Sequence, residues 1–61
     1  MYEVYEKLKT ERGVTDYQVA KATGTAAATL SAWKQGQYTP KIDKIKRIAD
    51  YFNVPIDVFL K

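Results

Sequence analysis

The chain has 61 residues, of which 46% are hydrophobic, and this length allows a single domain, residues 1–61, with one modest core. It contains neither cysteine nor histidine, which excludes disulfides, thiolate metal sites and histidine-dependent catalysis. The formal charge of +3 suits a nucleic-acid partner but is equally typical of an ordinary soluble surface. No apolar run approaches the about 20 residues that span a bilayer, and no signal peptide is visible, so we expect a cytoplasmic protein.

The first helix is expected over residues 2–11. Val4, Tyr5 and Leu8 fall on one face at helical spacing, which predicts that this face packs inward. Gly13 is expected to end the helix.

A second helix is expected over Asp16–Thr23. Thr15 precedes it and Gln18 stands three residues later, which is the spacing of a capping box. In this arrangement the Thr15 hydroxyl accepts from the backbone N–H of Gln18, and the Gln18 side chain reaches back. Gly24 follows where the chain must leave the helix, and glycine takes the left-handed conformation there without steric cost.

A third helix is expected over residues 27–35, closed by Gly36. Leu30 and Trp33 stand three residues apart and define its inner face. A capped helix, a glycine turn and a second helix with an inward apolar pair form the helix-turn-helix pattern used to read DNA. Residues 15–36 make up this predicted helix-turn-helix.

A fourth helix is expected from Pro40 or Lys41 to residue 52. Its predicted buried stripe consists of Ile42, Ile45, Ile48, Ala49 and Phe52. Asn53 suits a left-handed C-terminal position, and Pro55 suits the start of a last short helix over residues 55–60. No alternating run indicates a strand, so the sequence predicts an all-α, compact five-helix bundle.

The whole pattern resembles the phage-repressor (Cro/repressor-type, XRE-like) helix-turn-helix family, over nearly the entire chain. The residues that carry the resemblance are, in order, Thr15, Gln18, Val19, Ala20, Gly24, Leu30, Trp33, Gly36, Thr39, Pro40, Ile48, Ala49 and Val54. Each is common alone, but together and in this order they are specific. The resemblance implies a lambda-repressor-like bundle that binds operator DNA as a transcriptional regulator, with residues 26–35 as the recognition helix in the major groove.

The outer face of this recognition helix carries little base-reading chemistry. With Leu30 and Trp33 inward, helical geometry and the resemblance place six residues toward the bases, namely Ala27, Ala28, Thr29, Ser31, Ala32 and Gln35. The resemblance implies polar readers at the three alanine positions, yet an alanine methyl can touch only a thymine methyl. Two interpretations stay open: a DNA reader that uses methyl contacts, few hydrogen bonds and DNA shape, or a domain whose base-reading face is blank.

The start of the recognition helix also lacks an ordinary cap. Ala26 stands where the resemblance implies a serine or threonine, and a missing cap costs typically about 1 kcal/mol. Thr25, one residue earlier, is the alternative cap.

Phosphate contacts are expected at both ends of the helix-turn-helix, since they need no base-reading side chain. The start of the second helix offers free N–H groups and the positive end of the helix dipole. The candidates are Thr15, Tyr17 and Gln18 there, and Lys34, Gln37, Tyr38 and Thr39 after the recognition helix. Lys34 is the strongest by charge. Asp16 would repel a phosphate, and its expected role is to stabilise the first turn of its helix.

No enzymatic activity, metal site or cofactor is expected, because no nucleophile stands beside a base and no carboxylates have metal-binding spacing. The alternative function is a protein-interaction or dimerisation module on the same fold. The last helix carries more apolar surface than a short helix easily buries. This predicts a homodimer through Ile56, Val58, Phe59 and Leu60, although Ile56, Phe59 and Leu60 can instead fold back on the core. Dimerisation would also suit operator DNA, where two half-sites lie one helical turn apart.

Overall fold

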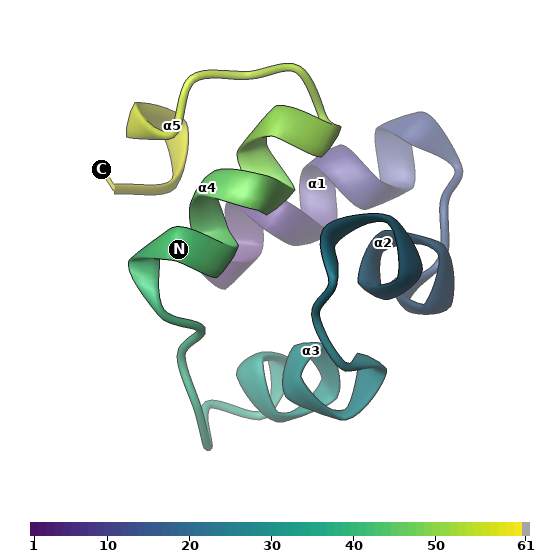
Figure 1. The fold of residues 1–61 in the computed structure, drawn as a ribbon, viewed down its shortest axis with the longest axis vertical. Helices are drawn as coiled ribbons and strands as arrows, with labels where there is room; N and C mark the ends of the chain where they lie inside the picture. Colours follow the sequence, from purple (N-terminus) through teal and green to yellow (C-terminus); the bar gives the residue numbers. More distant parts are fainter. Residues whose placement is uncertain (61) are drawn as a thin grey trace.

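Five helices follow one another in the computed structural model, which describes residues 1–60 (Figure 1). They are α1 (Tyr2–Arg12), α2 (Asp16–Thr23), α3 (Ala27–Lys34), α4 (Ile42–Tyr51) and α5 (Asp57–Leu60). No strand occurs within the described range. The predicted all-α, five-helix fold is therefore confirmed, while Lys61, the last residue of the predicted domain, lies outside the described residues.

The bounds of α2 are as predicted, and the boundaries of the other helices differ from the predicted ones by at most two residues. The largest differences are at the starts of α4 and α5. The latter begins at Asp57 because the N–H groups of Val58 and Phe59 bond to carbonyl oxygens only three residues earlier, at 3.2 and 2.9 Å, which is turn pairing rather than α-helical pairing. None of the helices in the described range is both long and apolar enough to cross a membrane.

The core joins all five helices around a group of aromatic rings. α2 packs against α3 and α4, and α5 packs against α1 (Figure 1). The Tyr5 ring of α1 lies between the other elements, with its centroid 5.3 Å from that of Trp33 and 6.1 Å from that of Phe52. The buried apolar side chains are Tyr5, Val19, Ala20, Leu30, Trp33, Ile45, Ile48, Ala49, Phe52 and Phe59. The inward placement predicted for Leu30 and Trp33 is confirmed, and it fixes which face of α3 is free.

The predicted capping box at the start of α2 is confirmed. The Thr15 Oγ1 accepts from the backbone N–H of Gln18 at 3.2 Å, and the backbone N–H of Thr15 donates to Gln18 Oε1 at 2.8 Å. At the other end, Gly24 adopts the left-handed conformation with φ of 72°. The turn between α2 and α3 therefore favours glycine because of its left-handed conformation; a Cβ there would lie 3.3 Å from Nη1 of Arg47, a flexible side-chain end that can move aside.

Two sequence-based expectations about packing are wrong. Ile42 was expected in the buried stripe of α4, but its side chain is 58% exposed, because it is the first residue of the helix and lies beyond the part that packs. Thr25 does not cap α3: it is only 8% exposed, and its Oγ1 lies 3.1 Å from that of Thr23. The N-cap is Ala26, which has no side-chain hydrogen bond, so α3 starts without a polar cap.

Of the two placements predicted for Phe59, folding back on the core is confirmed and a dimer interface is wrong. Phe59 is fully buried in the core of the single chain, and its neighbours in the turn, Ile56 and Val58, are half-buried. Leu60, by contrast, is 53% exposed and does not fold back on the core. Of the four residues proposed for dimerisation, Leu60 is therefore the one that presents a large apolar surface to solvent.

The capping box gives a direct test of how α2 is held. Thr15→Ala removes the acceptor for the N–H of Gln18, and we expect the free energy of unfolding to fall by about 1 kcal/mol. For a chain of this size that loss lowers the melting temperature by about 4–8 °C, which circular dichroism can measure. Thr10→Ala, at an exposed position inside α1, is the control and should change stability by less than about 0.5 kcal/mol. An equal effect of the two substitutions would contradict the capping role.

Candidate nucleic-acid interface

The outer face of α3 is open to solvent along its length. Because Leu30 and Trp33 turn into the core, the opposite side of the helix faces outward. Of the six predicted base-facing residues, Ala27, Ala28, Ser31 and Gln35 are exposed, and Thr29 and Ala32 are half-buried. Gln35 is the C-cap of α3 rather than part of its last turn. The exposed side chains of the first turn are thus methyl groups, and polar groups come only further along.

The seven predicted phosphate contacts are all exposed and lie in two groups. Thr15, Tyr17 and Gln18 lie at the start of α2, and Lys34, Gln37, Tyr38 and Thr39 lie at the end of α3 and in the following loop. The polar atoms of Thr15 and Gln18 are already engaged with each other in the capping box. What α2 offers to an anion are therefore the N–H groups of its first two residues, which precede the first bond within the helix.

The carboxylate of Asp16 is held by two residues of α1. Its Oδ1 accepts a hydrogen bond from the Tyr5 hydroxyl at 2.7 Å and another from the Lys9 ammonium at 3.0 Å. Lys9 also forms an ion pair with Glu6, with 3.2 Å between Nζ and Oε2. These bonds turn the negative charge at the start of α2 toward α1 and neutralise it with a cation. Asp16 thus does more than the predicted stabilisation of its own helix.

The same contacts shift the pKa values of the three groups. Burial favours the neutral form of Asp16, but the hydrogen bonds from Tyr5 and Lys9 outweigh it and hold its pKa below the ordinary value. Burial, and then the bond to Asp16, raise the pKa of the Tyr5 hydroxyl. Burial opposes the charge of Lys9, but its bonds to Asp16 and Glu6 raise its pKa overall. The aspartate is thus ionised and Tyr5 is a neutral donor at physiological pH.

Sequence reasoning missed Tyr5 and Lys9 as partners of Asp16. The available signal was weak: they stand four residues apart on one face of α1, and Tyr5 places a hydroxyl at an otherwise apolar core position. A buried tyrosine hydroxyl usually finds a partner, but the sequence alone does not say which one. The partner comes from the way α1 packs against the start of α2.

A hollow of about 340 Å³ lies between α2 and the start of α3. It is lined by Tyr17, Ala20, Lys21, Thr25 and Ala27. Tyr17 is 68% exposed, and Lys21 is exposed one turn further along the same helix. Sequence reasoning did not select Lys21, although its position four residues after Tyr17 places both on one side of α2.

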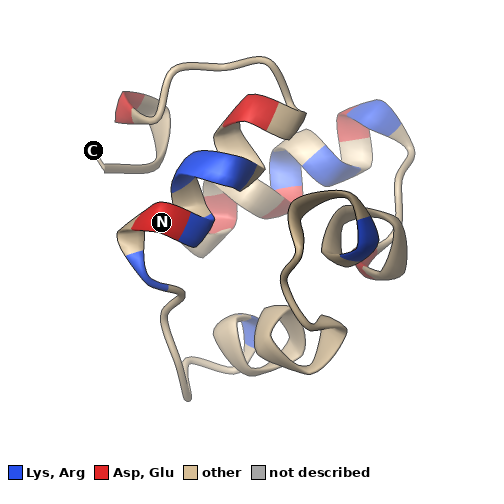
Figure 2. Cartoon of the chain, in the orientation of Figure 1, with Lys and Arg blue, Asp and Glu red and all other residues tan. Residues whose placement is uncertain are grey.

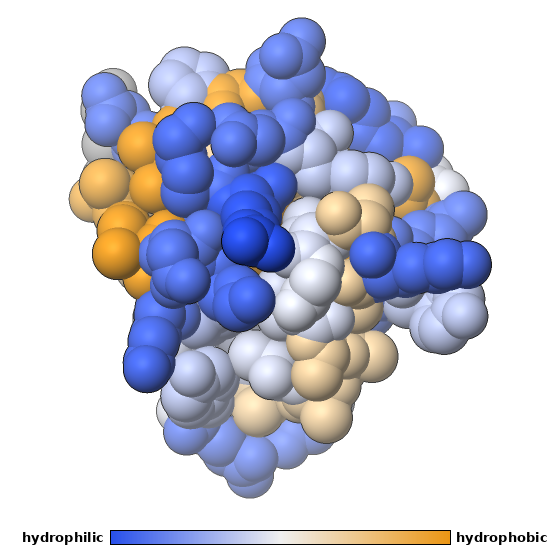
Figure 3. Space-filling model, in the orientation of Figure 1, coloured by the Kyte–Doolittle hydropathy of each residue, from blue (hydrophilic) through white to orange (hydrophobic). Residues whose placement is uncertain are grey.

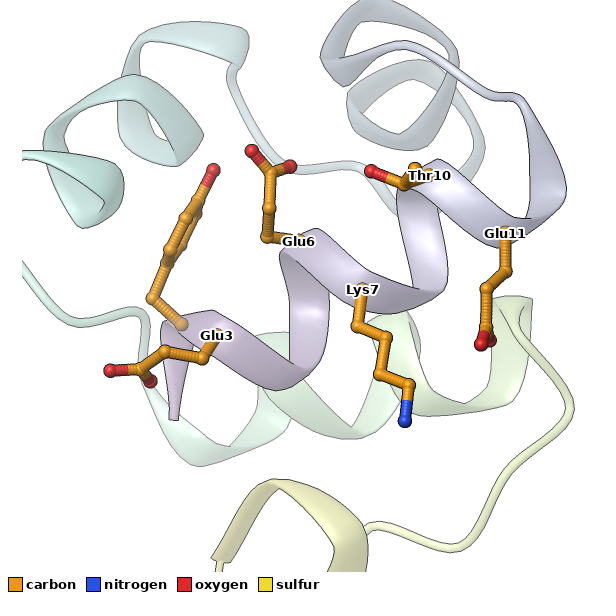
Figure 4. Close-up of a pocket in the computed structure, with 6 residues that line it drawn as sticks. Glu3, Glu6, Lys7, Thr10 and Glu11 are labelled. Atoms are coloured by element: carbon orange, nitrogen blue, oxygen red, sulfur yellow. The ribbon is translucent and has the colours of Figure 1, made fainter.

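A second hollow, of about 420 Å³, lies along α1 and is lined by Tyr2, Glu3, Glu6, Lys7, Thr10 and Glu11. Figure 4 shows Glu6 and Thr10 on one side of this helix and Lys7 and Glu11 on the other. Three carboxylates against one lysine give this surface the wrong sign for a phosphate backbone. The hollow between α2 and α3 is therefore the better candidate for contact with DNA.

Basic residues near the helix-turn-helix come from three helices (Figure 2). α2 carries Lys21. α3 carries one, Lys34. From α4, Lys44 approaches the Gly24 carbonyl oxygen with its Nζ at 3.4 Å, and Arg47 lies against the same turn. Lys46 is instead paired with Asp50 at 2.7 Å, so the basic run of α4 does not act as one surface.

A model of a known protein family matches residues 4–59, which is nearly the whole chain, and its description is helix-turn-helix. The chain belongs to the helix-turn-helix family. This is a family of DNA-binding domains without enzymatic activity, found in transcriptional regulators. The match agrees with the capped α2, the Gly24 turn and the outward face of α3.

Two curated relatives are similar to the chain. The cryptic phage CTXphi transcriptional repressor RstR of Vibrio cholerae is 31% identical over 49 residues, which cover 80% of this chain and 44% of the relative. The HTH-type transcriptional activator BcrR of Enterococcus faecalis is 29% identical over 58 residues, which cover 95% of this chain and 28% of the relative. The chain thus spans less than half the length of either. No solved structure matches the chain significantly.

The Asp16 contacts predict a specific dependence of stability on pH. Because the pKa of Asp16 is lower in the folded chain than in the unfolded one, its charged form stabilises the fold above the unfolded pKa of about 4. That contribution is lost as the pH falls through the folded pKa. Asp16→Asn should therefore lower the free energy of unfolding by about 1 kcal/mol at pH 7. The variant should also lose less of its free energy of unfolding than the wild type does when the pH is lowered below about 4. Urea titrations at pH 7 and at acid pH measure both effects.

Asp50→Asn is the matched control for this prediction. It removes an exposed ion pair with Lys46, which contributes little, and should change stability by less than about 0.5 kcal/mol. If the two asparagine variants lose the same stability at pH 7 and show the same acid dependence, the contacts of Asp16 with α1 do not stabilise the fold.

Proposed function

We propose that this chain is the sequence-specific, double-stranded DNA-binding domain of a phage-type transcriptional repressor, acting in the cytoplasm on operator DNA. The observation that carries the proposal is the outward face of α3. Buried Leu30 and Trp33 fix this helix on the core beside the capped α2, so its other side stays free. In this arrangement α3 lies in the major groove and α2 crosses above it.

The phosphate contacts position the domain on the duplex. One backbone strand meets the start of α2, where the N–H groups of Asp16 and Tyr17 precede the first bond within the helix, and where Thr15 and Gln18 are exposed. The bonds from Tyr5 and Lys9 draw the Asp16 carboxylate toward α1, which reduces its repulsion of phosphate. The other backbone strand meets the group that follows α3, which consists of Lys34, Gln37, Tyr38 and Thr39.

The base contacts come from the outer face of α3. Ala27, Ala28 and Ala32 offer methyl groups, which favour thymine methyls. Thr29, Ser31 and Gln35 supply the hydrogen bonds. With so few polar groups on α3, the shape and deformability of the DNA contribute a larger share of the specificity.

The repressor assignment draws on the relatives. The likeness to RstR, which is named a phage transcriptional repressor, supports repression, and the likeness to BcrR, which is named an activator, supports only the broader role of a transcriptional regulator. The two outcomes differ in where the operator lies relative to the promoter, so a reporter gene with the operator at either position separates them.

We also propose that the domain pairs with a second copy when it binds DNA. Ile42 and Leu60 expose 58% and 53% of their surface, and Figure 3 shows an apolar patch over the start of α4 and over α5. Half-buried Ile56 and Val58 adjoin this patch in sequence, whereas Phe59 is excluded by its burial. A two-fold arrangement through the patch gives two recognition helices for a palindromic site.

The experiment that tests the proposal is selection of duplexes from a random-sequence pool at low and moderate salt. An enriched motif, above all a palindrome, supports a sequence-reading domain. Weak binding with steep salt dependence and no motif means that the phosphate contacts work while the base-reading face is blank. Absence of binding at low salt overturns the proposal in favour of a protein-interaction module, for which the exposed alanines of α3 would be the contact surface.

Lys34 is the proposed cation of the phosphate contacts. Lys34→Ala should weaken binding to all duplexes alike and lower the slope of log affinity against log salt by about one. Lys7→Ala removes the same charge from the carboxylate-lined side of α1 and should leave the slope unchanged. A slope that Lys34→Ala does not alter removes Lys34 from the interface.

The proposed pairing predicts a change in oligomeric state. Leu60→Glu places a charge in the apolar patch and should shift the chain toward monomer in sedimentation velocity, and lower the apparent affinity for a palindrome more than for a half-site. Because Leu60 is exposed, the substitution should leave the fold intact. A wild-type chain that stays monomeric at high concentration, with and without DNA, contradicts the pairing.

A further inference from the structure

The start of α3 presents an unusual surface to a DNA partner. Ala26, Ala27 and Ala28 are exposed and carry no hydrogen-bonding side chain. Thr25, the polar residue just before them, is buried with its hydroxyl beside that of Thr23, so it cannot supply a hydrogen bond to DNA. In Figure 3 the surface over the turn and the start of α3 is white to tan, with the deep blue of charged groups beside it. Two polar side chains of another helix line a hollow together with Ala27.

Those groups are Tyr17 and Lys21 of α2. Both line the hollow that Ala27 closes from the other side, so they and the first turn of α3 face the same space. Tyr17 is 68% exposed, far more than a tyrosine that serves packing, and the buried Tyr5 shows the contrast within this chain. The ion pairs within residues 1–60 join other residues, which leaves the ammonium of Lys21 without a carboxylate partner there.

We propose that Tyr17 reads a base edge in the major groove across the space that Ala27 leaves open, and that Lys21 binds a phosphate beside it. The phenolic hydroxyl both donates and accepts hydrogen bonds, so it can pair with acceptors of guanine or with either group of adenine. A small side chain at Ala27 is then a requirement of this contact, because a longer one would fill the hollow. The base that faces the start of α3 is thus read by Tyr17 of α2 rather than by a side chain of α3.

This inference rests on the proposed DNA binding and gives Tyr17 a role beyond the phosphate contact expected from the sequence. A tyrosine that binds only phosphate fixes position and is indifferent to the base sequence. A tyrosine that reads a base affects one position of the selected motif and leaves the others unchanged. The two roles are therefore separable by measurement.

The experiment compares selected motifs and affinities of the wild type with those of Tyr17→Phe and Lys21→Ala. Tyr17→Phe should lose the preference at one base pair of each half-site, about five- to tenfold, while the affinity for random duplex and its salt slope stay the same. Lys21→Ala should keep the motif and lower the salt slope by about one. Tyr51→Phe is the matched control, because it removes the same hydroxyl from an exposed tyrosine at the end of α4, outside the proposed interface, and should leave every base preference unchanged.

The outcomes separate this inference from the proposed function. A motif that Tyr17→Phe leaves intact, or an equal loss of affinity for all sequences, overturns the reading role of Tyr17 while DNA binding stands. A wild-type chain that binds duplex without any motif overturns it as well, and a chain that binds no duplex overturns both. A further variant tests whether the hollow must stay open: Ala27→Gln fills it and should change the preference at the same base pair that Tyr17→Phe affects.

Discussion

The hydrogen bond between the Tyr5 hydroxyl and the Asp16 carboxylate is the contact on which the candidate interface depends most. The Tyr5 ring lies in the centre of the core, next to Trp33 of α3 and to Phe52, the C-cap of α4, while its hydroxyl reaches the first turn of α2. One side chain thus links the packing of three helices to the position of the fourth. A charge-assisted bond of this kind is stronger than a neutral one and restricts direction as well as distance. The start of α2, with its free N–H groups, is held to the core by it.

The scaffold and the proposed base-reading surface are built from different residues. The capping box, Gly24 and the pair Leu30 and Trp33 set the arrangement of α2 and α3, and they make no use of the outer side chains of α3. Family membership follows from the scaffold, which explains why the family model matches a chain whose proposed recognition helix, α3, begins with alanines. The same separation explains why the match does not identify a DNA sequence: the residues that decide it lie outside the pattern.

Local patterns predicted most of the fold. Helical periodicity and the cap and turn residues placed all five helices to within two residues, because these signals act over one or two turns of chain. The errors concern contacts between elements. Periodicity put Ile42 on the buried face of α4, but only the packed structure shows that the helix extends past its neighbours there. Spacing along the chain does not encode tertiary packing, and four further features depend on it. They are the burial of Phe59, the burial of the Thr25 side chain, the Tyr5–Asp16 hydrogen bond and the hollow beside Lys21.

The exposed alanines at the start of α3 have a consequence for how such a domain can change. Alanine has the highest helix propensity, so Ala27 and Ala28 keep α3 stable without adding any contact to the core. Glutamine or arginine at either position costs the helix only a few tenths of a kcal/mol. Half-buried Ala32, by contrast, has less room for a longer side chain. The first turn of α3 is therefore a site where new binding preferences can arise by single substitutions, while the rest of the fold tolerates the change without compensating mutations.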